Sequence, residues 1–231
     1  MMIGIIGAMQ IEIDGLKERV ADPEYAVYSG IEFVKGTIGD TQVVMAVCGM
    51  GKVFSAVCAQ TMILEYHVDA LITTGVAGNL SEKLGIKSVA VASDVVQHDM
   101  DLTPVGYKAG ELGGIDIVNI PCDKDLVEAV EACVKGMGIN YQIGTIATGD
   151  QFINKPEQKE FITGTFQAIA AEMEGASVGQ VCYINKVPFV IIRTISDEAN
   201  GDSPEDFPTF AKEAAAISIE IVLEVLKTYH K

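Results

Sequence analysis

The chain has 231 residues, of which 49% are hydrophobic and 21% charged, so a sizeable core is expected and extensive disorder is not. Its formal net charge of −16 argues against nucleic acid or an anionic membrane surface as a partner. The apolar residues come in short runs, far from the roughly 18 that a membrane-spanning helix requires, so no membrane span is expected.

Hydrophobic periodicity predicts alternating strands and helices along the chain, and no linker-like segment marks a domain boundary. We therefore expect one domain over residues 1–231. The expected strands are 2–7, 31–38, 42–48, 69–74, 88–96, 141–147, 168–173 and 187–195. The expected helices are 10–20, 52–66, 124–136, 156–163, 174–185 and 208–228, the third of them with Asp123 as its N-cap.

Two segments within the expected strands, 70–74 and 187–192, are apolar on both faces. Such strands lie centrally in a largely parallel sheet that helices cover on both sides. Residues 31–48 predict a hairpin that turns at Gly39 and Asp40. The predicted fold is therefore α/β, a single-domain three-layer α/β/α sandwich around a central mixed, mostly parallel sheet.

The five cysteines and three histidines do not form a metal-binding or redox motif. Neither C-x-x-C nor H-E-x-x-H occurs, so we expect no metal site. The cysteines lie in or beside apolar segments, which predicts buried thiols in a reducing compartment. The first residues lack the basic segment of a secretory signal, so the predicted location is cytoplasmic.

The glycine-rich segments do not match the motifs that bind nucleotide cofactors. Residues 49–52 read Gly-Met-Gly-Lys, but the upstream glycine of a phosphate loop is missing and Val53 replaces its hydroxyl residue. No G-x-G-x-x-G follows the first strand. We therefore expect neither a dinucleotide nor any other cofactor.

Glycines and acidic residues follow the apolar strands at the points where each strand should end. In an open α/β sheet, ligands bind beyond the carboxyl ends of the strands, so these segments predict one binding site. Glu12 and Glu174 lie in first helical turns, where the helix dipole already favours an acid. Asp197 closes an apolar strand that also carries Arg193, and a buried acid must be paired, hydrogen-bonded or functional.

Seven segments in this order together resemble the 5′-methylthioadenosine/S-adenosylhomocysteine nucleosidases, a family of the nucleoside phosphorylase superfamily. They are GIIGAM at 4–9 with Glu12, GMGK at 49–52, TGVAG at 74–78, HDMD at 98–101, TGDQFIN at 148–154, EME at 172–174 and RTISD at 193–197. The resemblance extends from residue 2 to about residue 228. It implies a nucleoside phosphorylase-like fold and hydrolysis of the N-glycosidic bond of methylthioadenosine and S-adenosylhomocysteine, which releases adenine and the 5′-thioribose.

The resemblance implies that Asp197 is the catalytic acid that protonates adenine at N7, with Ser196 holding its carboxyl group. The pKa of an unperturbed aspartate is about 3.9, so burial must raise it for the group to stay protonated. Glu12 corresponds to the catalytic base that positions and deprotonates the attacking water. Arg193 corresponds to a residue that orders this water and the neighbouring carboxylates.

The same resemblance implies the other contacts with an adenine nucleoside. The implied substrate-binding residues are Met9, Met50, Val76, Phe152, Ile153, Glu172, Met173, Glu174, Arg193, Ser196 and Phe207, with Leu102, Val105 and Tyr107 from a second subunit. Glu174 binds the ribose hydroxyl groups, Phe152 lies against adenine, and Met9, Met50 and Phe207 line the slot for the 5′-thioalkyl group. Because a second subunit completes this slot, a homodimer is expected.

Several positions differ from the usual pattern of the family, including Gly113, where proline is common, and residues 175–177, which read Gly-Ala-Ser where Ala-Thr is more usual. Val76 stands where a serine is usual, Asn79 where a small residue is usual, and Val105 where an aromatic residue is common. The changes at Val76 and Val105 affect the expected ribose contact and the expected 5′ slot, and none of the three removes a charged catalytic group.

Three alternative functions share parts of this pattern. A purine nucleoside phosphorylase would use phosphate, which Glu12 would repel and to which Val76 offers no hydrogen bond. A futalosine-type hydrolase uses nearly the same residues and stays open as a main or additional activity. A non-catalytic nucleoside sensor is disfavoured because Glu12, Glu174 and Asp197 are all present. The order of preference among methylthioadenosine, S-adenosylhomocysteine and 5′-deoxyadenosine also stays open.

Overall fold

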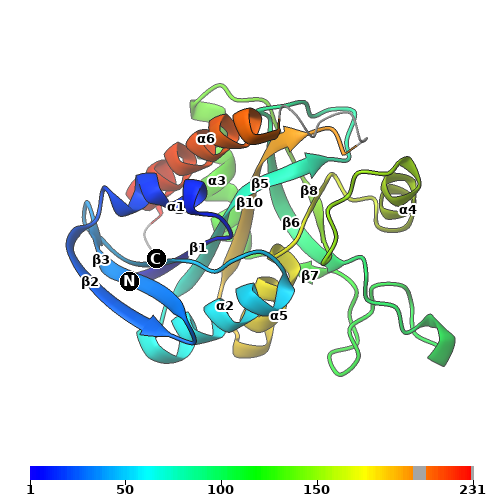
Figure 1. The fold of residues 1–231 in the computed structure, drawn as a ribbon, viewed down its shortest axis with the longest axis horizontal. Helices are drawn as coiled ribbons and strands as arrows, with labels where there is room; N and C mark the ends of the chain where they lie inside the picture. The colour runs from blue at the N-terminus through cyan, green and yellow to red at the C-terminus, as the bar shows by residue number, and fades with distance from the viewer. Residues whose placement is uncertain (200–206, 230–231) are drawn as a thin grey trace.

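The computed structural model describes residues 1–199 and 207–229, apart from the side chains of residues 207 and 208. Ten strands and six α-helices form within these residues (Figure 1). The strands are β1 (Met2–Gly7), β2 (Ala21–Tyr28), β3 (Ile31–Ile38), β4 (Thr41–Val47), β5 (Ala70–Asn79), β6 (Val89–Gln97), β7 (Ile120–Pro121), β8 (Tyr141–Thr148), β9 (Ala170–Glu172) and β10 (Phe189–Asp197). The helices are α1 (Gln10–Lys17), α2 (Lys52–Tyr66), α3 (Lys124–Gly136), α4 (Pro156–Phe166), α5 (Gly175–Asn185) and α6 (Phe207–Thr228), with a short 3-10 helix, η1 (Thr103–Val105).

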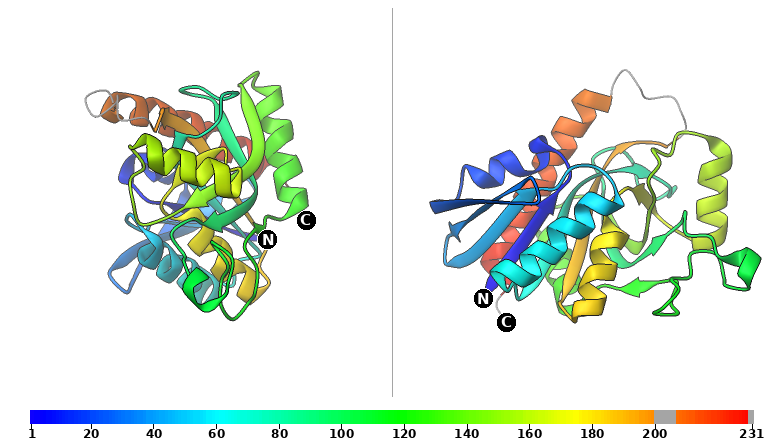
Figure 2. Two further views of the ribbon diagram at one scale, coloured as in Figure 1. Left: turned by 90° about the vertical axis from the view of Figure 1, so that its right-hand side faces the viewer. Right: turned by 60° about the horizontal axis from the view of Figure 1, so that its bottom comes forward.

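Helices cover both faces of one sheet, which confirms the predicted three-layer sandwich (Figures 1 and 2). On one face, Ile6 of β1 packs in a cluster with Met62 of α2 and Cys182 of α5. On the other, Ile5 packs in a second cluster with residues of α1, α3 and α6, such as Leu16 and Val222. Because successive residues of β1 face two dry layers, the strand appears in the sequence as a continuous apolar run.

The sheet is mixed, as predicted, and its order is β10-β6-β8-β9-β5-β1-β4-β3-β2, with β7 beside β6. Its centre is parallel, since β1 runs parallel to both β4 and β5. β10 pairs with β5 in parallel and with β6 antiparallel, so β5, β9, β8, β6 and β10 form a closed ring of paired strands. This half of the sheet is therefore closed, not open as expected. Register shifts at 195–197 in β10 and at 92–94 in β6 mark irregularities of the kind that bend strands.

The predicted hairpin is formed by β3 and β4, with Ile38 opposite Thr41 across the turn. β2 extends this hairpin, and the sequence does not predict it. Nearly all of its residues are exposed, so it has no alternation of apolar and polar residues to reveal it. β7 is also missed, because two residues are too few to show any period.

The helices begin and end close to the predicted residues. Asp123 caps α3 as predicted, with its Oδ1 accepting a hydrogen bond from the Leu126 amide at 3.0 Å. α1 ends at Lys17, three residues earlier than predicted, and β2 begins at Ala21. Within the part of the chain that the structure describes, no helix is long and apolar enough to cross a membrane.

Candidate active site

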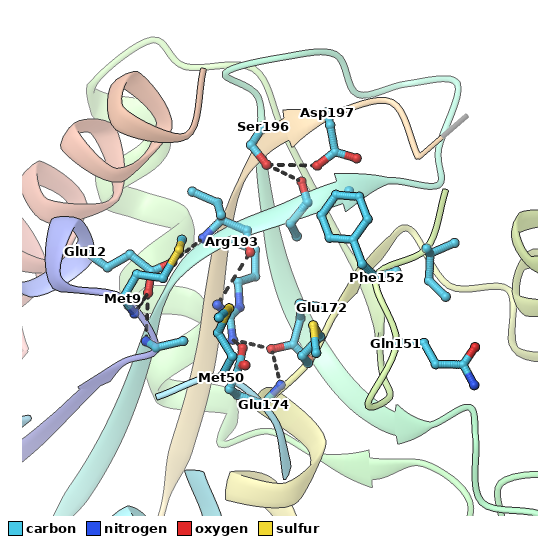
Figure 3. A pocket seen from close by; sticks show the side chains of 17 residues that line it. Met9, Glu12, Met50, Gln151, Phe152, Glu172, Glu174, Arg193, Ser196 and Asp197 are labelled. Carbon is cyan, nitrogen blue, oxygen red and sulfur yellow. Dashed lines mark hydrogen bonds and ion pairs between the residues drawn. The ribbon is translucent and has the colours of Figure 1, made fainter. Parts of the chain in front are cut away.

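Residues at the carboxyl ends of β1, β5, β9 and β10 enclose a cavity of about 150 Å³ (Figure 3). The expected site residues that line it are Met9, Glu12, Met50, Val76, Phe152, Ile153, Glu172, Met173, Glu174, Arg193, Ser196 and Asp197. The lining residues that were not predicted are Ala8, Ala77, Gly78, Gln151 and Ala171. Except for Ala171, these unpredicted residues lie inside the family segments at 4–9, 74–78 and 148–154. Their place in those segments could have indicated them as site residues.

Glu12, in the first turn of α1, is buried and its carboxylate accepts three backbone hydrogen bonds. Its Oε2 accepts from the amides of Ala8 at 2.7 Å and Met9 at 2.8 Å, and its Oε1 accepts from Val76 at 3.1 Å. Because Met9 is the N-cap residue, the carboxylate also fixes the start of the helix, as in a capping box. Burial raises the pKa of Glu12, while Arg193 and the three amides act in the opposite direction.

Val76 takes part in this site through its backbone. The prediction that it offers no hydrogen bond holds for its side chain only, because its amide donates to Glu12. Its carbonyl oxygen accepts from Nη1 of Arg193 at 3.5 Å. The preceding Gly75 permits this arrangement, since a Cβ there would collide with the Glu12 carboxylate and the Arg193 guanidinium group.

Arg193 is a buried cation that lies between two carboxylates of the cavity (Figure 3). Its Nη2 forms an ion pair with Glu172 and a second, at 3.2 Å, with Oε2 of Glu174. Glu172 also accepts hydrogen bonds from the Thr148 hydroxyl and from the amides of Glu174 and Gly175, the last at 2.7 Å. Glu172 therefore joins β8, β10 and the start of α5.

Glu174, the N-cap residue of α5, lines the cavity with its carboxylate. Its Oε1 accepts a hydrogen bond from the Gly51 amide at 2.8 Å. Burial raises the pKa of Glu174 to about 7, with Arg193 opposing this change and Glu172 adding to it. A carboxyl group that titrates near neutral pH in a cavity is a candidate for a functional role.

The raised pKa of Glu174 predicts a contribution to the pH dependence of stability. The folded state holds this proton up to about pH 7, whereas the unfolded chain releases it near the ordinary value of 4.5. The contribution is therefore fully present below pH 4.5 and is lost as the pH rises through 7, at about 1.4 kcal/mol per pKa unit. We expect Glu174→Gln to reduce the fall in unfolding free energy between pH 4.5 and 8, measured by urea denaturation.

The exposed Glu32→Gln variant controls for the loss of a carboxylate outside the cavity. It should reproduce the pH dependence of the unmodified chain. If the unfolding free energy fell equally with pH in Glu174→Gln and in the unmodified chain, the assignment of a raised pKa to Glu174 would be contradicted.

Asp197 is the last residue of β10, and its carboxyl group is held at both oxygens. Oδ2 accepts from the Ser196 hydroxyl at 3.0 Å, as predicted, and Oδ1 accepts from the Ala199 amide at 3.0 Å. Burial raises the pKa of Asp197 by more than these hydrogen bonds lower it. Figure 3 shows Asp197 and Glu12 on opposite sides of the cavity, with Phe152 near Asp197.

Apolar side chains form much of the remaining wall. Met9 and Met50 lie on the side of Glu12 and Glu174 (Figure 3). Met50 is 64% exposed and Phe152 is 55% exposed, so both belong to the rim of the cavity. A ligand with an apolar body and a few polar groups is the kind that such a cavity accepts.

Three predicted substrate-binding residues with described side chains are not among the residues lining the cavity. Leu102, Val105 and Tyr107 belong to a segment around η1 that projects from the body of the protein, seen in green in Figures 1 and 2. They were predicted to act on a second subunit, and their absence from the chain's own cavity is compatible with that prediction. The side chain of Phe207 lies outside the described residues.

Lys52 joins three segments around the cavity in a network that the sequence does not predict. Its Nζ donates to Asp99 Oδ1 at 2.7 Å, and its amide donates to Asp150 Oδ1 at 2.8 Å. Asp99 Oδ2 accepts from the Asp150 amide at 2.9 Å. Burial alone would raise the pKa of Asp99, but the hydrogen bonds from Lys52 and Asp150 bring it below its usual range. The network connects the loops that carry Met50 and Phe152.

The site thus holds two buried carboxyl groups, Asp197 and Glu12, on opposite sides of one cavity, and three backbone amides anchor Glu12. Such a pair suits cleavage of a bond placed between them, with Asp197 donating a proton to the leaving group and Glu12 accepting one from water. A base with a pKa raised toward the working pH is more effective, and burial moves Glu12 in this direction.

The sequence matches the phosphorylase superfamily over residues 2–227. The chain is 40% identical over 228 residues to the 5′-methylthioadenosine/S-adenosylhomocysteine nucleosidase of Staphylococcus carnosus, which covers 98% of this chain and 100% of that relative.

Two solved structures share the fold closely. One is the 5′-methylthioadenosine/S-adenosylhomocysteine nucleosidase of Neisseria meningitidis in complex with methylthio-immucillin-A, with a TM-score of 0.96, 32% identity and 99% of each chain covered. The other is a futalosine hydrolase of Helicobacter pylori, with a TM-score of 0.94, 34% identity, and 99% of this chain and 98% of that chain covered. The chain belongs to the phosphorylase superfamily, and within it to the family of 5′-methylthioadenosine/S-adenosylhomocysteine nucleosidases.

Proposed function

We propose that this protein is an N-glycosyl hydrolase that cleaves 5′-methylthioadenosine and S-adenosylhomocysteine into adenine and the 5′-thioribose. The observation that carries this proposal is the placement of Asp197 and Glu12 on opposite sides of one cavity that Glu174 also lines (Figure 3). The family membership of the chain supports the same reaction.

In the proposed reaction, Asp197 protonates N7 of adenine while the bond between the base and the ribose breaks. The ribose then becomes oxocarbenium-like, and water activated by Glu12 attacks its anomeric carbon. Burial of Asp197 supports the acid role because it favours the protonated form. Arg193, which is paired with Glu172 and Glu174, keeps these acidic groups from destabilising one another in the cavity.

We place the substrate so that each of its parts meets matching chemistry. Adenine lies beside Phe152 and the backbone of Ile153, on the side of Asp197. The ribose hydroxyl groups bind the Glu174 carboxylate, and Met173 covers the sugar. The 5′-thioalkyl group lies toward the thioether side chains of Met9 and Met50, with Phe207 completing the slot.

The experiment that tests this proposal is product analysis after incubation with methylthioadenosine, with and without millimolar phosphate. Adenine and free methylthioribose, formed at a rate indifferent to phosphate, would support hydrolysis. Methylthioribose 1-phosphate formed only with phosphate would refute it and identify a phosphorylase. We expect hydrolysis because the Glu12 carboxylate, at about 4 Å from a phosphate, would oppose its binding by several kcal/mol.

Futalosine hydrolysis is a second candidate activity, supported by the structural similarity to the futalosine hydrolase of Helicobacter pylori. Either nucleoside could use the same acid, Asp197, the same base, Glu12, and the same ribose-binding carboxylate, Glu174. Competition assays with futalosine and methylthioadenosine test it, because one shared site requires each to inhibit cleavage of the other.

We also propose that two copies of the chain form a homodimer. The outward face of α2 carries Val53, Phe54 and Leu64, between 58% and 74% exposed. The neighbouring α5 adds Tyr183 and Ile184, which are also exposed. An apolar surface of this kind favours association, and the projecting segment around η1 can then bring Leu102, Val105 and Tyr107 to the partner's cavity.

The homodimer predicts that Phe54→Glu disrupts both association and activity. A buried charge at the interface should convert the protein to a monomer in light scattering and lower kcat/KM by about 10-fold or more, because the partner's apolar contacts are lost. Met137→Glu, at the end of α3 on the opposite face, is the matched control and should change neither property. A dimeric, fully active Phe54→Glu variant would count against this interface.

We further propose a cytoplasmic location, a role in methionine salvage and a single nucleoside phosphorylase-like domain over residues 1–231. Unpaired thiols support the location, because all five cysteines are free and disulfides are rare in that compartment. One sheet that includes every strand of the described residues supports the single domain. No cofactor enters the proposed reaction, which needs only water as the second substrate.

A further inference from the structure

Asn79, one of the departures from the family pattern, is buried at the end of β5 and binds the turn that follows Asp197. Its Nδ2 donates to Oε2 of Glu198 at 2.7 Å and to the Leu84 carbonyl at 2.9 Å. Its Oδ1 accepts from the Ser81 amide at 2.9 Å. The side chain thus makes three hydrogen bonds, and one of them binds Glu198, the residue next to Asp197.

Helix α4 holds the same turn through a hydrogen bond to its backbone. Lys159 of α4 donates from Nζ to the Glu198 carbonyl oxygen at 2.8 Å. Ala199 adopts a left-handed backbone conformation, with φ of 51°, and its amide donates to Asp197 Oδ1. Because this conformation is unfavourable for alanine, the turn depends on such outside contacts to keep its shape.

Two charged neighbours, Glu198 and Lys159, have opposite effects on the pKa of Asp197. Among its neighbours, the Glu198 carboxylate raises the pKa of Asp197 and the Lys159 ammonium group lowers it, both by less than burial does. Among the residues that the structure describes, the other charged groups that line the cavity are Glu12, Glu172, Glu174 and Arg193. Glu198 and Lys159 are therefore the charged groups that can be changed without altering the proposed catalytic and binding residues.

We propose that Asn79 and Lys159 are positioning residues that hold the Glu198 turn, so that Glu198 and Asp197 keep a fixed arrangement at the cavity. Asn79 fixes the Glu198 carboxylate near Asp197, and Lys159 fixes the backbone, so that the Asp197 carboxyl group stays directed into the cavity. This inference rests on the proposed role of Asp197 as the acid of the reaction.

The first test compares the pH dependence of kcat/KM for Glu198→Gln and Lys159→Met with that of the unmodified protein. The alkaline limb of this profile reports loss of the essential proton from the free enzyme. Glu198→Gln removes a negative charge near Asp197 and should move this limb to lower pH. Lys159→Met removes a positive charge and should move it to higher pH, each by about 0.5 to 1 unit. A merely structural role would lower the rate in both variants without opposite shifts.

The second test concerns the position of the turn. We expect Asn79→Ala to lower kcat by at least about 10-fold while KM changes little, because acid transfer is sensitive to geometry. Asn140→Ala is the matched control, since Asn140, just before β8, also donates twice from Nδ2, to the Lys83 carbonyl and the Ser88 hydroxyl, and neither partner belongs to the Glu198 turn. If Asn79→Ala does not fold, Glu198→Gln still tests the inference, because a glutamine oxygen can accept from Asn79.

A readout without substrate separates this inference from the proposed reaction. Carboxyl ¹³C resonances of labelled aspartates give the ionisation of Asp197 directly, and Asp197→Asn assigns its signal. Opposite displacements of this titration by Glu198→Gln and Lys159→Met support the inference, and any other pattern overturns it. Absence of nucleoside cleavage by the unmodified protein would refute the proposed function alone.

Discussion

Replacing Asp197 by asparagine is expected to lower kcat for methylthioadenosine hydrolysis by about 10³-fold, the usual contribution of a general acid. Asparagine has nearly the same shape but holds no proton that it can transfer to N7 of adenine. Its single side-chain oxygen can still accept from the Ala199 amide, and its NH2 group can donate to the Ser196 hydroxyl oxygen, so the turn should keep its structure. The fold should remain intact, because a neutral group replaces an acid whose ionised form is disfavoured by burial.

The decisive measurement for Asp197→Asn uses two substrates that differ only in the leaving group. Adenine needs a proton to leave. The 4-nitrophenolate of a 4-nitrophenyl 5-methylthioriboside leaves readily without one. We expect the variant to lose activity toward methylthioadenosine and to retain most of its activity toward the nitrophenyl compound. Asp125→Asn, exposed in the first turn of α3, is the control for an altered charge. Equal losses on both substrates would show that Asp197 does not act as the acid.

Replacing Glu12 by glutamine is expected to lower kcat by about 10³-fold on both substrates, because attack by water then lacks its base. The substitution also turns an amide donor toward backbone amides that already donate to this position. Of the three hydrogen bonds from Ala8, Met9 and Val76, at least one cannot form in the variant. We therefore expect a loss of stability of about 1–3 kcal/mol in addition to the loss of rate.

Stability and rate can be separated for Glu12→Gln. Urea denaturation measures the first, and single-turnover kinetics at a temperature where the variant is fully folded measures the second. Glu18→Gln, exposed at the end of the same helix, should leave both unchanged. A folded Glu12→Gln variant with the full rate on methylthioadenosine would remove Glu12 from the proposed mechanism.

The core elements of this fold could be predicted from the sequence because their residues carry the signal locally. The strands that became β1, β5 and β10 are buried on both faces, so each appears as an apolar run of its own. Asp123 predicts the start of α3, because an N-cap acts within one helical turn. The segments that line the cavity could be predicted for a related reason, since strand ends in an α/β sheet converge on one edge, whereas the individual substrate-binding residues came from the resemblance to the family.

Other features depend on residues far apart in the sequence, and only the tertiary structure decided them. The exposed strand β2 has no hydrophobic period, and β10 closes a ring by pairing with both β5 and β6. Lys52 meets Asp99 across 47 residues, and Asn79 meets Glu198 across 119. The pKa of about 7 for Glu174 likewise arises from burial beside Glu172 and Arg193. Local patterns encode which segments are strands and helices, whereas burial and long-range contacts arise only when those segments pack together.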